Sequence, residues 1–256
     1  MRRIHLFEFE DQTWFPSFLR NYVTDFLQFL SNKAKVYQPV IDVIHNTLNA
    51  GHTSTIIDLG SGSGGGLLWL SDELKKINPA LQIILTDLFP NIEAFEYTRQ
   101  KSSDFDYFQH PVDAKNVPEN LKGLRTQFLS FHHFNPDDAR MIIQNAVNAQ
   151  QPMAIFEIQD RSFPSFIAML LSPVSVLFTT PFIRPFRIGR LVFTYVIPVI
   201  PLVVLWDGIV SCLRTYSVDE MKALVDSLDN KKSYSWEFDK KKSKTGFVMY
   251  MIGIPA

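Results

Sequence analysis

The amino-acid sequence predicts an α/β fold in which helices cover both faces of a mostly parallel sheet. Short apolar runs alternate with helical segments from residue 55 to residue 158, which is the pattern of buried parallel strands joined by helices. The first run, TIIDL, leads directly into a loop in which five of seven residues are glycine. Glycine at this density weakens helices and strands, so the loop is expected to serve a ligand or a tight turn.

The elements follow from the pattern in chain order. Residues 14–30 carry apolar side chains at helical spacing opposite a polar face. A second helix is expected over residues 37–50, before Gly51. The remaining segments alternate, with strands expected at 55–59, 81–87, 105–114, 125–131 and 152–158, helices at 67–77, 91–100, 136–149 and 218–229, and a terminal strand pair at 233–238 and 246–254 across a Lys-rich turn.

Composition narrows the classes of function. The 256 residues include 25 basic and 26 acidic side chains, so no basic field exists to hold a nucleic acid, and we expect no nucleic-acid partner. Cys212 is the single cysteine, which excludes a disulfide within the chain and is typical of a reducing compartment. No apolar segment follows the N-terminal arginines, so we expect no secretory signal. We therefore expect a cytoplasmic protein.

Residues 160–215 interrupt the α/β order as a hydrophobic insertion between the fifth strand and the last helix. Residues 163–183 and 191–206 carry no charge, and RPFRIGR lies between them. Straight membrane-spanning helices are disfavoured because prolines interrupt both runs. Two interpretations stay open: a buried cap over an active site, or a hairpin that dips into the membrane surface. The arginines of RPFRIGR could meet lipid phosphates, bind an acidic substrate or be solvated. The prolines in question are Pro173, Pro181, Pro198 and Pro201.

The glycine loop fits two ligand motifs. Gly60, Gly62 and Gly65 satisfy the dinucleotide pattern GxGxxG, whereas Asp58 to Gly64 satisfies DxGxGxG. A ligand-free turn is the third reading. Acidic residues then recur at strand ends: Asp87 could accept hydrogen bonds from ribose hydroxyls or be a helix N-cap, and Asp113 could accept from an adenine amino group or form a turn.

Taken in order, DLGSGSG, LTDLFP, VDAKNVP and SFHHF resemble the motifs of class I S-adenosylmethionine-dependent methyltransferases. The resemblance covers residues 37–158 and the terminal strand pair. The N-terminal segment and the insertion are similar to those of an uncharacterised bacterial branch of that superfamily. The resemblance implies a Rossmann-like seven-stranded sheet in which the antiparallel last strand lies between the fifth and sixth.

The resemblance also implies S-adenosylmethionine as the cofactor and assigns roles to the motif residues. Gly60 and Gly62 would flank the methionine moiety, Asp87 would hold the ribose, and Asp113 with Ala114 would border the adenine. Phe131 would line the pocket. The complete set of expected cofactor contacts is Asp58, Gly60, Ser61, Gly62, Gly64, Asp87, Leu88, Asp113, Ala114 and Phe131.

Three residues are candidates for catalysis. His132 and His133 could act as a general base if the acceptor is protonated, although shaping the cofactor pocket is the more ordinary role. Alternation along FLSF favours His133 as the residue that faces the methyl group. Glu157 ends the fifth strand and points either to the core or to the active-site crevice. Asp160 and Arg161, which follow it, could form a structural ion pair with each other or with another neighbour, or could have a catalytic role.

No metal site is expected from the sequence. Only two of the six histidines, His132 and His133, are adjacent, none has HxxxH spacing, and no carboxylate partner is obvious. Nucleophilic catalysis is also not expected, because no GxSxG motif is present and Cys212 has no flanking signature.

The apolar surplus predicts a lipophilic acceptor. The insertion and the stripe of residues 14–30 would line its site, while Arg214 or Tyr216 would orient a polar acceptor atom unless the tyrosine faces the core. The predicted substrate contacts are therefore Trp14, Phe18, Tyr22, Arg214 and Tyr216.

The sequence thus predicts one methyltransferase domain, residues 1–256, with a helical cap segment at 1–50 and the insertion at 160–215. Its expected function is methyl transfer to a small or medium lipophilic acceptor, with oxygen as the first choice of acceptor atom and nitrogen or carbon left open. A nucleotide-dependent oxidoreductase and a non-catalytic membrane-binding or partner-binding protein on this fold are the alternatives. Peripheral contact with the inner face of the membrane, or a homo-oligomer through the insertion, stays open.

Overall fold

A computed structural model describes residues 2–243 and 246–256. Its centre is a seven-stranded sheet in the order β3-β2-β1-β4-β5-β7-β6. Strands β1 to β5 pair in parallel, and β7 pairs antiparallel with both β5 and β6. The predicted placement of an antiparallel last strand between the fifth and sixth is confirmed. The strands are β1 Thr55–Leu59, β2 Gln82–Thr86, β3 Phe105–Tyr107, β4 Leu124–Phe128, β5 Met153–Glu157, β6 Tyr234–Ser243 and β7 Gly246–Pro255.

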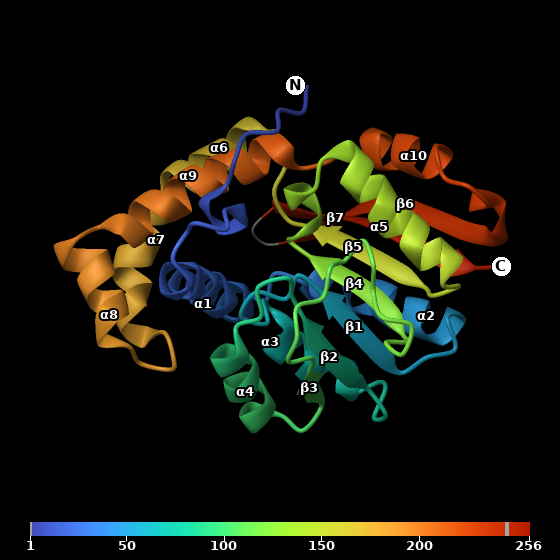
Figure 1. Cartoon of the computed structure of the whole chain (residues 1–256), viewed down its shortest axis with the longest axis horizontal. Coiled ribbons are helices and arrows are strands. Elements are labelled where there is room, and N and C mark those ends of the chain that lie inside the picture. The colour runs from blue at the N-terminus through green and yellow to red at the C-terminus, as the bar shows by residue number, and fades with distance from the viewer. Residues whose placement is uncertain (1, 244–245) are drawn as a thin grey trace.

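Helices cover both faces of the sheet, as predicted (Figure 1). One face packs on α2 (Ile41–Ala50), α3 (Leu67–Lys75) and α4 (Ile92–Lys101), and the other on α5 (Pro136–Asn148) and α10 (Val218–Asp226). The strands are almost fully buried because apolar side chains from both helical layers meet them. The Lys-rich turn expected at residues 239–245 is shorter than predicted, because β6 continues to Ser243 and pairs Lys240, Lys241 and Lys242 with β7; residues 244–245 lie outside the described residues.

A second, helical layer lies beside the sheet. Helix α1 (Ser17–Ala34) separates the sheet from the insertion, whose helices are at the left of Figure 1. Apolar residues of α1, α7 and α9 form a third buried cluster that includes Phe26, Val176 and Ile200. The insertion consists of α6 Phe163–Leu170, α7 Ser172–Thr179, α8 Ile188–Leu191, a π-helical turn Val192–Val196 and α9 Val199–Arg214.

The proline prediction for the insertion is confirmed, because its helices are short and bent. Within the described residues, no individual helix has both the length and the apolar character of a membrane span. Two pairs of consecutive helices have the length and apolar character of a span when each pair is taken together. Each pair is bent, by 41° after Leu170 in the first and by 78° after Val196 in the second.

The N-terminal segment crosses from the insertion to the sheet. Asp207 of α9 accepts hydrogen bonds from the backbone N–H groups of Phe9 (2.8 Å) and Glu10 (3.3 Å). The indole of Trp206 donates to the carbonyl of Phe7, and the amide of Ile4 donates to the carbonyl of Leu213. Helix α9 therefore fixes this segment over the ends of β4 and β5.

Candidate functional site

The glycine loop follows β1 and adopts a conformation that requires glycine. Gly60, Gly62 and Gly64 have φ angles of 72°, 57° and 92°, in the left-handed region that other residues rarely adopt. A Cβ on Gly62 would lie 3.2 Å from Thr24 Cγ2, because α1 packs directly against the loop.

Asp58 and Ser61 anchor this loop to the sheet. Asp58 is buried and accepts a hydrogen bond from the hydroxyl of Thr126 on β4 (2.9 Å). Burial raises the pKa of Asp58 to about 7, and the hydrogen bonds that it accepts oppose this only in part. Ser61 donates from its amide to the carbonyl of Thr86 and from its hydroxyl to the carbonyl of Asp58. Asp58 and Ser61 therefore fix the loop to the sheet through hydrogen bonds within the protein.

Polar side chains of α1 complete the loop's surroundings. The hydroxyls of Thr24 and Ser63 lie 2.7 Å apart, and the Ser63 hydroxyl donates to Asp25 (2.9 Å). The Asn32 amide donates to the carbonyl of Gly65 (2.7 Å), and the Gln28 amide donates to that of Ser63. The polar face of α1 had no role assigned from the sequence. In the structure it packs against the glycine loop and is hydrogen-bonded to it.

Asp87 lies at the end of β2 and faces the loop. Its carboxylate accepts hydrogen bonds from the amides of Gly62 (2.7 Å) and Phe89 (2.8 Å). It is not the N-cap of α4, because Asn91 has that role. Each carboxylate oxygen has a second lone pair, so Asp87 can still accept from the two hydroxyls of a ribose. The neighbouring Leu88 is half exposed.

The Asp113 segment lies beside Asp87, since the Val112 amide donates to the Asp87 carbonyl (2.8 Å). Asp113 accepts from the backbone of Lys115 (2.9 Å), which is the turn that the alternative interpretation expected. Its side chain stays 42% exposed and can accept a further hydrogen bond, while Ala114 is buried next to it.

Phe131 lies in the buried core beside the Asp113 segment. Its side chain is fully buried, and its ring centroid lies 5.2 Å from that of Tyr216 in the core beneath α5 and α10. Ala114 belongs to the same buried cluster, and the role of Phe131 in lining the cofactor pocket stays a prediction.

His132 is held by a buried carboxylate. Its Nδ1 lies 3.0 Å from one oxygen of Glu157 and its amide donates to the other (3.0 Å). Glu157 is fully buried and also accepts from Gln159. Glu157 therefore positions His132, and Nε2 is the ring nitrogen that His132 directs away from it.

His133 is the more exposed of the pair, with 22% of its side chain accessible against 3% for His132. Its Nδ1 donates to Asp11 (2.8 Å) and lies 3.1 Å from Glu8. Burial alone would lower the pKa of His133, but the carboxylates of Glu8 and Asp11 outweigh it and raise the pKa to about 10. The ring carries a proton at neutral pH in this arrangement, so it cannot accept one without a change in its surroundings.

Arg214 and Tyr216 are not free to bind an acceptor. Arg214 is buried, pairs with Asp11 (2.6 Å) and Glu8 (3.2 Å), and donates to the carbonyls of His132 and His133. The Tyr216 hydroxyl donates to the carbonyl of Phe134 (2.9 Å). Their expected substrate roles are corrected: Arg214 fixes the histidine pair, and Tyr216 is the core-facing tyrosine of the alternative.

Sequence reasoning missed Glu8 and Asp11. The premise that the histidine pair has no carboxylate partner is wrong, because the N-terminal segment brings both carboxylates to it. The signal was the segment FEFEDQ, in which acids alternate with aromatic residues at a distance of more than 120 residues from the histidines. Asp160 and Arg161 do not pair with each other, but the expected structural ion pair with another neighbour is present, because Arg161 pairs with Glu220 (2.7 Å). Asp160 accepts hydrogen bonds from Ser162 and Ser165.

The three aromatic residues expected at the acceptor differ in position. Trp14 is 66% exposed and Phe18 43%, and Phe18 packs against Phe193 of the insertion. Tyr22 is buried against Gly189, so in this arrangement it packs the insertion onto α1 instead of facing a ligand.

Two of the three arginines between the apolar runs are already paired. Arg190 is buried against Asp25 (2.6 Å), and Arg187 pairs with Glu93 (2.7 Å), which leaves Arg184 to meet an external anion.

Comparison with known proteins identifies the fold. No family model and no curated protein matches the chain. Among solved structures it is similar to the plantazolicin methyltransferase BpumL in complex with SAH, with a TM-score of 0.55, 10% identity, and coverage of 94% of this chain and 96% of that chain. It is also similar to PigF with SAH (0.53, 18%, 95% of this chain) and the methyltransferase domain of bacterial CtHen1 (0.50, 13%, 86% of this chain and 99% of that one). The match spans 63% of PigF. The chain has the class I methyltransferase fold.

Proposed function

We propose that this protein transfers a methyl group from S-adenosylmethionine to a lipophilic acceptor, with an oxygen as the first choice of acceptor atom. The observation that carries the proposal is the meeting of the glycine loop, Asp87 and Asp113 at the ends of neighbouring strands on the class I fold. Ligands of open α/β sheets bind at this edge. The bound cofactor would supply the electrophilic methyl group, and the chain would supply alignment and exclude water.

The residues present fit that cofactor. The left-handed glycines allow close approach to the loop backbone, and both aspartates keep acceptor capacity for hydroxyl and amino groups. Buried Asp58 and Ser61 would hold the loop without touching the cofactor.

The oxidoreductase alternative has less support. A dinucleotide-binding sheet is built from two parallel mononucleotide-binding halves in the order 3-2-1-4-5-6. Here the position after β5 is occupied by antiparallel β7, which does not continue the second half.

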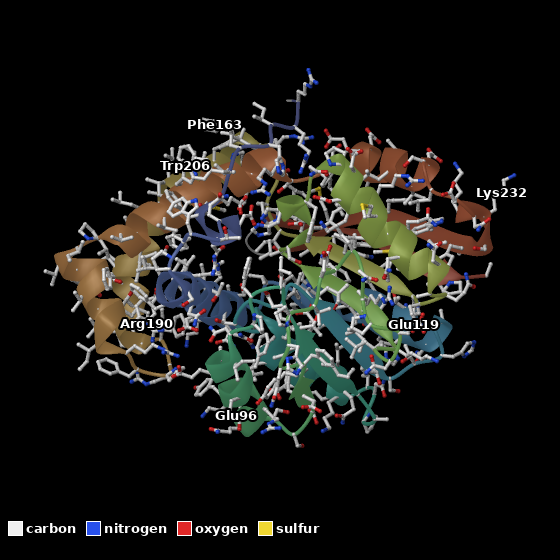
Figure 2. All side chains as sticks on the ribbon, viewed as in Figure 1. Glu96, Glu119, Phe163, Arg190, Trp206 and Lys232 are labelled. Carbon is white, nitrogen blue, oxygen red and sulfur yellow. The ribbon has the colours of Figure 1, made fainter. Side chains whose placement is uncertain are left out.

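The acceptor side is built by residues 1–50 and 160–215, which we propose as a cap on a single domain. The outer face of the insertion is strongly apolar, and Figure 2 shows Phe163 and Trp206 on its upper edge. Patches of this kind mark interaction surfaces. Peripheral contact with a membrane would cover the face and bring it near lipophilic acceptors. The large apolar side chains of the insertion that are more than 60% exposed are Phe163, Phe178, Phe182, Ile188, Val196 and Leu202.

Equilibrium binding tests the proposal. Calorimetric titration of the purified chain with S-adenosylhomocysteine should give saturable binding, and titration with NADH should give none. Binding of NADH alone would favour the oxidoreductase. Binding of neither, with tight membrane association, would favour the non-catalytic alternative.

A further inference from the structure

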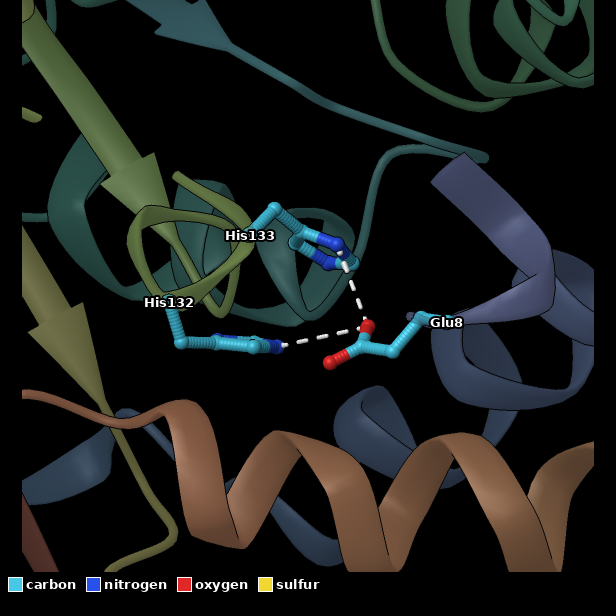
Figure 3. Close-up of side chains that lie close together, drawn as sticks. All are labelled: Glu8, His132 and His133. Atoms are coloured by element: carbon cyan, nitrogen blue, oxygen red, sulfur yellow. Dashed lines mark ion pairs between the residues drawn. The ribbon is translucent and has the colours of Figure 1, made fainter. Parts of the chain in front are cut away.

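Three side chains from two distant parts of the chain converge at the ends of β4 and β5. Figure 3 shows His132 and His133, from the turn after β4, and Glu8, from the N-terminal segment, with their polar ends directed towards one another. One ligand atom from each lies within 4.8 Å of the others. We propose that Glu8, His132 and His133 form a binding site for one divalent transition-metal ion, such as Zn²⁺ or Co²⁺.

The spacing suits such an ion. Glu8 Oε2 lies 3.1 Å from His133 Nδ1 and 4.0 Å from His132 Nε2. Donors about 2.1 Å from a tetrahedral zinc ion are about 3.4 Å apart, which lies between these two distances. Side-chain shifts of less than about 1 Å would therefore equalise the distances around an ion.

One oxygen of the buried Glu8 carboxylate accepts no hydrogen bond. The carboxylate is fully buried, and no described residue donates a hydrogen bond to Oε2, because the Nδ1 proton of His133 is directed at Asp11. The other oxygen, Oε1, is held by Arg214 (3.2 Å) and Ser211 (3.3 Å). The ion pair with His133 Nδ1 (3.1 Å) offsets the burial of Oε2, and a cation in place of that proton would pair with this oxygen directly.

Supporting contacts of the kind found around metal ligands are also present. Metal-binding histidines almost always donate their second ring nitrogen to a carboxylate or carbonyl group. The Nδ1 of His132 contacts Glu157 (3.0 Å), which leaves Nε2 facing Glu8. In His133 the nitrogen nearest Glu8, Nδ1, also contacts Asp11 (2.8 Å), so an ion would have to displace the proton between Nδ1 and Asp11. Glu157 would thus be a positioning residue.

The charge of the cluster favours a cation. Three carboxylates, from Glu8, Asp11 and Glu157, contact the two imidazoles. The guanidinium of Arg214 pairs with the carboxylates of Glu8 and Asp11. With neutral imidazoles these groups sum to −3 + 1 = −2, which a divalent ion would neutralise once it had displaced the proton that His133 carries in this arrangement. Two imidazoles and a carboxylate suit zinc, iron and cobalt better than magnesium or calcium, which prefer oxygen ligands alone.

The remaining coordination positions would open towards the accessible side of His133. An anionic acceptor oxygen could occupy one of these positions. The glycine loop is close by, because the hydroxyl of Ser130 donates to the carbonyl of Leu59, the residue before the loop. This last step rests on the proposed methyl transfer, whereas the metal site itself does not.

Metal titration of the full chain tests the site. After treatment with a chelator, Co²⁺ should bind with a stoichiometry of one and produce visible d–d bands. Glu8→Gln and His132→Gln should each weaken binding by about 10- to 100-fold, and Glu157→Gln by a similar factor. His110→Gln is the matched control, because this exposed histidine lies far from the cluster in sequence and should leave binding unchanged.

X-ray absorption on the zinc-loaded wild-type chain keeps the test decisive if a variant fails to fold. It should show two imidazole ligands with oxygen at about 2.0–2.2 Å and no sulfur. The proposal is overturned by failure of the wild type to bind Co²⁺ or Zn²⁺, by equal affinity in the cluster variants and in His110→Gln, or by a sulfur ligand. Binding of S-adenosylhomocysteine is measured separately, so loss of one result does not decide the other.

Discussion

Asp25 is predicted to be the residue that couples the insertion to the glycine loop. Its carboxylate is 1% exposed and lies 2.6 Å from the guanidinium of Arg190, which is itself 2% exposed. The other oxygen accepts from the hydroxyl of Ser63 in the glycine loop (2.9 Å). Replacing Asp25 by alanine would leave a guanidinium buried without its carboxylate.

The expected cost follows from this burial. Removing one partner of a buried ion pair destabilises a protein by about 3–5 kcal/mol, because the remaining charge stays desolvated. Arg190 also donates to the carbonyls of Ile183 and Pro185, which would moderate but not cancel the loss. We therefore expect Asp25→Ala to lower the free energy of unfolding by about 3 kcal/mol or more.

Urea unfolding of the single variants Asp25→Ala and Arg190→Ala and of the double variant measures this effect. The double variant should cost less than the sum of the singles, since it leaves no unpaired charge. Asp72→Ala, on an exposed position of α3, is the control and should change stability by less than about 0.5 kcal/mol. Strictly additive losses, or a loss in Asp25→Ala no larger than in the control, would refute the coupling.

Further predictions concern pH, catalysis and the membrane. Burial raises the pKa of folded Asp58 to about 7, so the stability linked to its protonation is present below the unfolded pKa and is lost as pH rises through about 7. Relative to Asp58→Asn, the wild type should therefore lose about 2–3 kcal/mol of unfolding free energy between pH 5 and pH 8. Parallel pH profiles of the two proteins would contradict this prediction. If His133 acts as a general base, which requires its contacts with Glu8 and Asp11 to change when ligands bind, His133→Ala should reduce turnover more than affinity for S-adenosylhomocysteine. Equal loss of both, or loss of neither, would indicate a structural role. Carbonate washing should release the full-length protein from membranes, and a long-chain amphiphile should protect residues 163–206 from protease; a strict need for detergent would instead indicate an integral hairpin.

The repeating units of the fold could be predicted because each carries its own local signal. Apolar runs such as TIIDL have no polar face, which is expected only for strands buried on both sides, and the glycines that follow mark the turn into α3. The prolines of the insertion likewise indicated short, bent helices. The order of the last strands came from the resemblance and not from the pattern of residues.

The surroundings of the histidine pair could not be predicted, because they depend on contacts between distant segments. Glu8 reaches the histidine pair because Asp207 and Trp206 of α9 hold the N-terminal backbone in place. Arg214 was expected at the acceptor because the sequence does not show which carboxylates will pair with it. The resemblance likewise gave only the position of Phe131 in a motif, whereas the turn after β4 decides the direction of its ring, which packs near Tyr216.

The most direct test of the central claim is a calorimetric comparison of wild type and Asp87→Ala, with S-adenosylhomocysteine as the ligand. The wild type should bind, and the variant should lose about 1.5–3 kcal/mol of binding free energy, the range for hydrogen bonds to a charged group, which corresponds to about 10- to 150-fold in Kd. Unchanged affinity in the variant would remove Asp87 from the site, and absence of binding by a folded wild type would contradict the proposed cofactor.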